Sequence, residues 1–226
     1  MTQETYRTIE NFMLQCMDDS AHDREHVYRV LYNALEIAKA EPNVHFDLLI
    51  TACLLHDIGR KDQIADQRLC HAQVGSEKAY AFLLQMGMEE AFAQQVKHCI
   101  QAHRFRKNCQ PQTLEAKILF DADKLDVTGA IGIARTLLYQ GTLSEPLYRL
   151  LPDGTISDGT HEIAHSFFRE YKFKLETLYD RFYTQKGAEL AKSRQAIAAA
   201  FYENLYQEVN AGYTAGKEDL QTHIQS

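Results

Sequence analysis

The spacing of the apolar residues is the feature that most constrains the fold of this chain. Apolar side chains recur every three or four positions over most of the 226 residues, which is the repeat of an amphipathic α-helix. Helix breakers are scarce, with 4 Pro and 11 Gly, and residues that favour helices are plentiful. The sequence therefore predicts an all-α protein.

Turn-forming residues divide the predicted helices into a core and a C-terminal part. The core is expected over about 20–140, an irregular surface loop over 141–160, and further amphipathic helices over 161–212. We expect one domain that spans 1–226. The polar tail after Gly216 is expected to fray.

Helices are predicted at 4–17, 48–56, 71–86, 89–104 and 114–139. A further helix, the second along the chain, is predicted to begin after Asp23, which would cap it. Asp47 is expected to cap the helix at 48–56, and Gly59 to end it as a left-handed residue. Residues 61–70 are expected to form a polar loop.

Net charge and cysteine content indicate which partners and which cellular compartment suit the protein. A net charge of −7 argues against a broad nucleic-acid or anionic-membrane surface, although one anionic small molecule could still bind in a local cationic pocket. The first residues are polar and acidic, so no secretory signal is expected, and the longest apolar stretch, 48–55, is too short to span a bilayer. Five cysteines without CxxC spacing are typical of reduced thiols. We expect a cytoplasmic protein.

One dipeptide, His56-Asp57, indicates metal chemistry. It follows a strongly apolar segment, and a helix that ends at Gly59 would let both side chains converge although adjacent helical residues point about 100° apart. His26 lies upstream, and a segment with three aspartates at 121, 123 and 126 lies downstream. Two imidazoles and two carboxylates from three segments are sufficient to hold one divalent metal.

This mixture of ligands restricts the metal and its chemistry. Imidazole with carboxylate suits Mn, Fe, Co, Ni, Mg or catalytic Zn, and it argues against a closed cysteine-type structural zinc site. Four protein ligands would leave two positions of an octahedron for water and substrate. A water bound there becomes a hydroxide at neutral pH, which is suited to attack on a phosphoryl group.

Several segments together resemble the HD-domain metal-dependent phosphohydrolase superfamily, and most of all its compact bacterial branch with nucleoside-triphosphate pyrophosphohydrolases. The matching segments are 22–30, 54–59, 71–76, 98–105, 115–126, 129–135 and 170–175. The resemblance covers most of residues 20–210. It implies an all-α, single compact HD-domain helical bundle with extra C-terminal helices.

The resemblance also implies a ligand set, which comprises His26, His56, Asp57 and Asp123. Asp123 is preferred to its rivals Asp121 and Asp126 because it directly precedes Lys124, as the ligand does in related proteins. The expected cofactor is one divalent metal, with manganese the first choice and Mg, Co, Ni, Fe or Zn as alternatives.

Substrate residues are expected close to these ligands. Lys124 and Arg29 are candidates for binding phosphate, and Asp126 for a hydrogen bond to a nucleophilic water or a ribose hydroxyl. Arg60 stands where several relatives keep an acid or base. Arginine cannot act as a base, so it would clamp phosphate, offset leaving-group charge, or simply belong to a solvated loop.

Three further residues are candidates for the outer part of the centre. His71 resembles a histidine that related enzymes aim at substrate phosphate or a second metal, and His103 resembles another second-metal or outer histidine. Asp23 would either orient the His26 imidazole or only cap its helix.

The predicted function is hydrolysis of a (deoxy)nucleoside triphosphate to monophosphate and pyrophosphate by a metal-activated water. The alternatives are a nucleoside 5′-monophosphate phosphatase, a dinuclear HD phosphodiesterase or oxygenase, and a nucleotide-sensing helical domain without turnover. The expected partner is a nucleotide, with no nucleic acid and no membrane. The amphipathic C-terminal helices would permit a homodimer.

Overall fold

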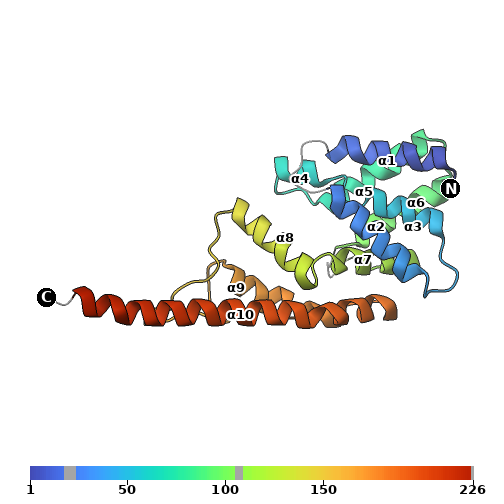
Figure 1. The fold of residues 1–226 in the computed structure, drawn as a ribbon. Helices are drawn as coiled ribbons and strands as arrows, with labels where there is room; N and C mark the ends of the chain where they lie inside the picture. Colours follow the sequence, from blue (N-terminus) through green and yellow to red (C-terminus); the bar gives the residue numbers. More distant parts are fainter. Residues whose placement is uncertain (18–23, 105–108, 225–226) are drawn as a thin grey trace. The chain divides into compact units, whose positions relative to one another are not determined.

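The computed structural model describes residues 1–17, 24–104 and 109–224, which form two compact units. The first unit comprises Met1–Asp126 with Phe182–Ala188, and the second comprises Val127–Arg181 with Glu189–Ser226. Apart from isolated bridge residues at Cys109, Leu150 and Ile156, every regular element in the described residues is helical (Figure 1). The predicted all-α class is confirmed.

The first unit contains seven helices in its described part. They are α1 (Gln3–Met17), α2 (Arg24–Ala38), α3 (Phe46–Leu55), α4 (Arg60–Ala65), α5 (His71–Gln85), α6 (Glu90–Ala102) and α7 (Leu114–Leu125).

Helix α3 is the centre of this unit. It contacts α1, α2, α5, α6 and α7, and seven of its ten residues are buried. Its sequence is apolar on nearly all sides, which explains why it can be surrounded by other helices. His45 caps it, because the His45 Nδ1 accepts a hydrogen bond of 3.2 Å from the backbone N–H of Leu48. Asp47, the predicted cap, lies instead in the first turn.

The predictions for Gly59 and for the loop 61–70 were wrong in part. Gly59 has φ −90° and is the N-cap of α4, which occupies the first half of the predicted loop. A Cβ atom on Gly59 would overlap the His71 carbonyl oxygen and lie 2.6 Å from the Gly75 backbone nitrogen. Glycine is required here because two backbones approach closely, and not because of a left-handed conformation.

The single helix predicted over 114–139 is interrupted. Helix α7 ends at Leu125, and α8 (Gly129–Thr142) begins after a short turn. Gly129 has φ 58°, and a Cβ atom on Gly132 would overlap the carbonyl group of Val127. Both glycines permit a tight turn that the apolar periodicity alone did not reveal.

The second unit differs most from the prediction. After α8 it contains α9 (Phe167–Glu170), a π-helical turn η1 (Tyr171–Leu175), a 3₁₀ turn η2 (Leu178–Asp180) and most of α10 (Gln185–Ile224). The amphipathic helices expected from residue 161 do not begin there, and Ile163 is 96% exposed. Helix α10 continues past Gly216 to Ile224, so the predicted fraying is not observed.

Aromatic packing accounts for the irregular segment before α10. The Tyr171 ring stacks on Tyr202 of α10 with centroids 4.1 Å apart. The wider π turn, with a 2.8 Å bond from the Glu176 N–H to the Tyr171 carbonyl, accompanies this contact.

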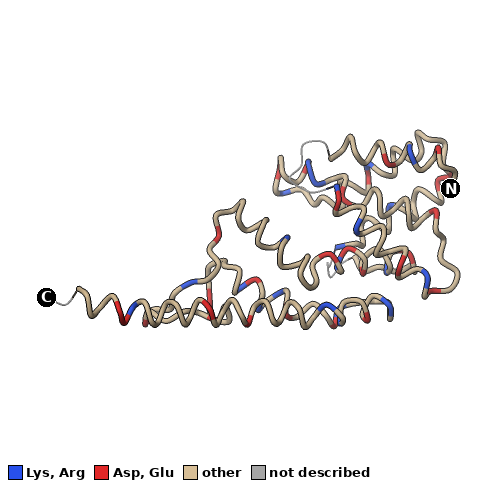
Figure 2. The backbone as a smooth tube through the Cα atoms, viewed as in Figure 1, with Lys and Arg blue, Asp and Glu red and all other residues tan. Residues whose placement is uncertain are grey.

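Basic and acidic residues are interspersed along the described chain (Figure 2). No helix among the described residues is long and apolar enough to cross a membrane.

Candidate metal centre

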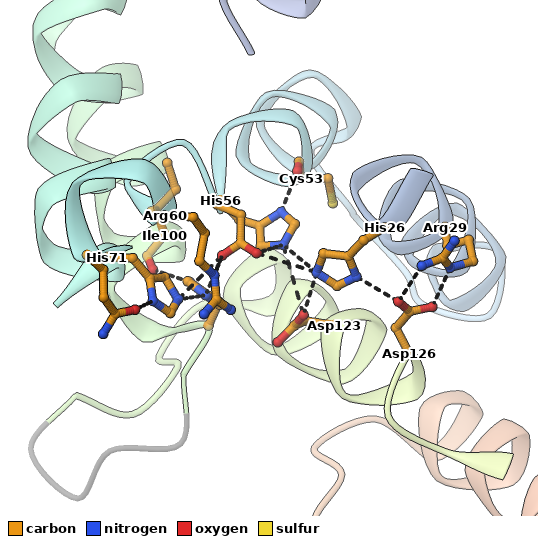
Figure 3. Close-up of polar contacts among 12 residues, drawn as sticks. His26, Arg29, Cys53, His56, Arg60, His71, Ile100, Asp123 and Asp126 are labelled. Atoms are coloured by element: carbon orange, nitrogen blue, oxygen red, sulfur yellow. Dashed lines mark hydrogen bonds and ion pairs between the residues drawn. The ribbon is translucent and has the colours of Figure 1, made fainter. Parts of the chain in front are cut away.

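Six side chains of the first unit converge at the ends of its central helices (Figure 3). His56 and Asp57 directly follow α3, and His71 is the first residue of α5. The other three come from α2, from the residue after α6, and from α7; they are His26, His103 and Asp123. All six are buried except Asp123, whose side chain is 27% exposed.

Each histidine is held through its Nδ1 atom. The Nδ1 of His56 donates to the Cys53 carbonyl at 2.7 Å, and that of His103 to the Ile100 carbonyl at 2.6 Å. A carbonyl only accepts, so these Nδ1 atoms carry the proton and the Nε2 atoms carry a lone pair. The Nδ1 of His26 lies 2.7 Å from Asp126 Oδ2, and the Nδ1 of His71 lies 2.5 Å from Gln63 Oε1.

The Nε2 atoms face one another in two pairs around Asp57. In the first, the Nε2 atoms of His26 and His56 are 3.3 Å apart and lie 3.6 and 3.8 Å from Asp57 Oδ2. Asp123 Oδ1 completes this cluster at 3.2 Å from His26 Nε2. We call these four residues the inner cluster.

The second pair lies on the other side of the same carboxylate. The Nε2 atoms of His71 and His103 are 3.4 Å apart and lie 3.4 and 3.6 Å from Asp57 Oδ1. We call His71, His103 and this oxygen the outer cluster.

The inner cluster fits a divalent metal. Asp57 Oδ2 is buried and has no hydrogen-bond partner among the described residues. A buried carboxylate oxygen without a partner is costly, and a cation surrounded by two imidazole nitrogens and two carboxylate oxygens would remove that cost. The nitrogen and oxygen donors suit manganese and the other divalent ions of this class.

The charges of the cluster shift its pKa values in opposite directions. Burial lowers the pKa of His26, but its interactions with the carboxylates of Asp123, Asp126 and Asp57 outweigh burial and raise the pKa to about 10. Burial lowers the pKa of His56, and it lowers the pKa of His71 to about 2 and that of His103 to about 4.

The two carboxyl groups stay ionised. Burial alone would raise the pKa of Asp57, but the His56 and Arg60 charges hold it well below its usual range. The pKa of Asp123 is likewise lowered, because bonding to His26 outweighs burial. In the metal-free protein the inner cluster therefore combines two ionised carboxylates with a protonated His26 and a neutral His56.

Asp126 and Arg29 are engaged with each other rather than directed at the inner cluster. The Asp126 carboxylate is buried and accepts two bonds from Arg29, from Nε at 2.8 Å and Nη2 at 3.1 Å, besides that from His26. The expected hydrogen bond of Asp126 with a nucleophilic water or a ribose hydroxyl stays a prediction. Orientation of His26 is the role that these contacts support.

Asp121, a rival for the last ligand position, lies elsewhere. Its carboxylate accepts from the backbone N–H groups of Tyr183 and Thr184 and from the Thr184 hydroxyl, at 2.6 to 3.1 Å. These bonds anchor the segment just before α10. Among the three aspartates, only Asp123 joins the inner cluster.

The other predicted residues vary in position. Lys124 Nζ lies over the Phe120 ring, 4.3 Å from its centroid, and Arg60 Nε donates to Asp57 Oδ1 at 3.0 Å. Asp23 lies outside the described residues. Gln63, which holds His71, was not foreseen, because its segment was predicted to be a loop.

Comparison with known proteins agrees with this geometry. Residues 24–128 match the HD domain family. The chain is 31% identical over 196 residues to the uncharacterized protein YpgQ of Bacillus subtilis, covering 85% of this chain and 86% of YpgQ.

Solved structures give the same result. A predicted HD superfamily hydrolase from an uncultured Thermotogales bacterium is 30% identical, with a TM-score of 0.61 over 89% of this chain and 91% of that one. YpgQ in complex with ADP is 26% identical, with a TM-score of 0.70 over 91% and 95%. From these matches and the buried histidine and aspartate cluster, the chain belongs to the HD-domain superfamily of hydrolases.

Proposed function

We propose that the protein is a metal-dependent phosphohydrolase that converts a (deoxy)nucleoside triphosphate to the monophosphate and pyrophosphate. The observation that carries this proposal is the inner cluster, with its unpartnered, buried Asp57 oxygen. The nucleotide is supported by the ADP complex of YpgQ. Manganese is the proposed ion.

The inner cluster would hold the metal through the Nε2 atoms of His26 and His56 and through carboxylate oxygens of Asp57 and Asp123. When bound, a divalent ion polarises a phosphoryl oxygen and lowers the pKa of a coordinated water. Asp126 fixes the His26 ring so that its Nε2 points into the cluster, and the Cys53 carbonyl does the same for His56.

The negative charge of the substrate's phosphates would be offset by the basic side chains around the inner cluster. Arg60 is 26% exposed beside Asp57, and Lys124 directly follows a ligand. We propose that both offset charge on phosphate oxygens, with Arg29 acting mainly through Asp126. His71 and His103 are neutral at pH 7 and can accept hydrogen bonds from water or from a substrate hydroxyl.

Chromatography of a nucleotide panel after incubation with Mn²⁺ tests the reaction. Pyrophosphate together with a monophosphate supports the proposal. Orthophosphate released from monophosphates would reassign the protein as a nucleotidase, and tight nucleotide binding without any product would indicate a sensor.

The Asp57→Asn variant tests the site itself. The substitution removes a charged ligand, so we expect loss of bound manganese and a fall in kcat of at least about 100-fold. Mutation of a residue that only hydrogen-bonds to a metal ligand already lowers metal affinity or activity by about 10- to 100-fold. Asp219→Asn, an exposed aspartate on α10, is the matched control and should retain both. Full activity of metal-free Asp57→Asn protein would contradict the proposal.

A second candidate, a dinuclear phosphodiesterase, is favoured by the outer cluster, which presents two imidazole nitrogens to the second oxygen of Asp57. The number of metal ions per chain separates the two candidates.

A further inference from the structure

The two clusters around Asp57 are alike in their ligands but differ in how the carboxylate oxygen is compensated. Oδ2, in the inner cluster, has no hydrogen-bond partner among the described residues, whereas Oδ1, in the outer cluster, accepts a 3.0 Å bond from Arg60 Nε. Oδ2 therefore lacks a hydrogen-bond donor among the described residues, whereas Oδ1 is already bonded to the Arg60 guanidinium.

The backbone places Arg60 at this position. Arg60 is the first residue of α4, and its backbone N–H donates to the Asp57 carbonyl at 3.0 Å, so the two side chains are three residues apart in one turn. Gly59 allows this turn to lie directly against the start of α5, where His71 lies. Arg60 Nε and His71 Nε2 thus both lie near Asp57 Oδ1, at 3.0 and 3.4 Å.

Arginine has a particular effect at such a site. Its guanidinium stays protonated and offers no lone pair, so it can compensate a carboxylate but cannot bind a metal. A fixed positive charge bonded to Oδ1 opposes the entry of a second divalent ion at the same oxygen. His71 and His103 still keep their lone pairs, because both rings are held through Nδ1.

We propose that Arg60 sets the metal count of the centre. It supplies the positive charge that a second ion would otherwise supply at Asp57 Oδ1, and so restricts the protein to one metal, in the inner cluster. Without Arg60, the outer cluster of His71, His103 and Asp57 Oδ1 is a complete three-ligand site. This inference rests on the inner cluster being the metal site of the proposed function.

Manganese per chain, measured by elemental analysis after loading and desalting, tests the inference. We expect one ion in the wild-type protein and two in Arg60→Gln, which keeps a hydrogen-bond donor but removes the charge. Electron paramagnetic resonance of Arg60→Gln should show the signal of a coupled manganese pair, which a single ion cannot give. Arg60→Lys, which keeps the charge, should bind one ion.

The double variant Arg60→Gln/His103→Ala is the matched control and should return to one ion, because it lacks a ligand of the outer cluster. Arg60 is partly exposed, so circular dichroism should show the wild-type helical content in each variant. Two ions in the wild-type protein, or one in folded Arg60→Gln, would overturn the inference while leaving the proposed function intact. A wild-type protein that binds no manganese would contradict the metal centre itself.

Discussion

The orientation of each histidine ring in the candidate metal centre depends on the group that is bonded to its Nδ1 atom. Two are held by carbonyl groups one helical turn earlier, His56 by Cys53 and His103 by Ile100. His26 is instead held by a carboxylate, that of Asp126. A carboxylate behind an imidazole makes the ring a better metal ligand than a carbonyl does.

The contribution of this carboxylate can be measured with Asp126→Asn. The amide still accepts a hydrogen bond from His26 but lacks the charge, so we expect manganese affinity to fall by about 10- to 100-fold with the fold retained. Titration calorimetry with Mn²⁺ gives the dissociation constant. Asp62→Asn is the control; Asp62 lies in α4 and pairs with Lys78 of α5. Equal affinity in Asp126→Asn and wild type would show that Asp126 does not act through His26.

At the scale of elements, the position of α4 against the start of α5 builds one side of the centre. Arg60 begins α4, Gln63 lies within it and holds His71, and Gly59 allows the close approach. The binary pattern of apolar and polar residues gave no sign of this helix, because none of its six residues is buried. Its place is decided by contacts between backbones and between polar side chains.

Gly59→Ala tests this contact. The added methyl group would overlap the His71 carbonyl oxygen, and backbone atoms cannot move aside as a flexible side chain can, so we expect a loss of about 2 kcal/mol or more in unfolding free energy. Urea denaturation measures it. Gly141→Ala is the matched control: in the described part of the chain no atom outside the adjoining residues of its own helix lies within 4 Å of the added methyl group, and alanine favours helix. Similar stability of the two variants would mean that the close approach at Gly59 has no energetic weight.

At the scale of the whole molecule, burial of several imidazoles makes stability depend on pH. His71 and His103 are neutral in the folded state, with pKa values of about 2 and 4, while an unfolded histidine titrates near 6.5. As pH falls below about 6.5, the unfolded state takes up protons that the folded state cannot, so stability falls. His26, with a pKa of about 10, has the opposite sign: its contribution is complete below about 6.5 and is lost as pH rises through 10.

We therefore expect the metal-free protein to be most stable near pH 6.5 and to lose stability on either side. Each of His71 and His103 contributes a loss of about 2 kcal/mol between pH 6.5 and 5. Urea denaturation of chelator-treated protein at pH 5, 6.5 and 9 measures this. The variant His71→Asn/His103→Asn should show a smaller loss on the acid side. Unchanged stability between pH 6.5 and 5 in the wild-type protein would contradict this account.

The sequence alone predicts the all-α class, the positions of α2, α3, α5 and α6 to within a few residues, and the histidines and aspartates that the fold brings together. It could do so because helical periodicity is a local property, and because histidines and aspartates in apolar segments are costly unless they meet a cation or one another.

The separate roles of these residues are set by tertiary contacts. Asp123 faces His26, Asp126 lies behind it, and Asp121 holds the chain before α10, although all three occupy six consecutive positions of the sequence. Such roles depend on contacts between residues about 60 to 100 positions apart. The position of α4 depends on contacts over shorter separations, between Gln63 and His71 and between Gly59 and Gly75. Periodicity within one helix carries no information about what lies opposite it.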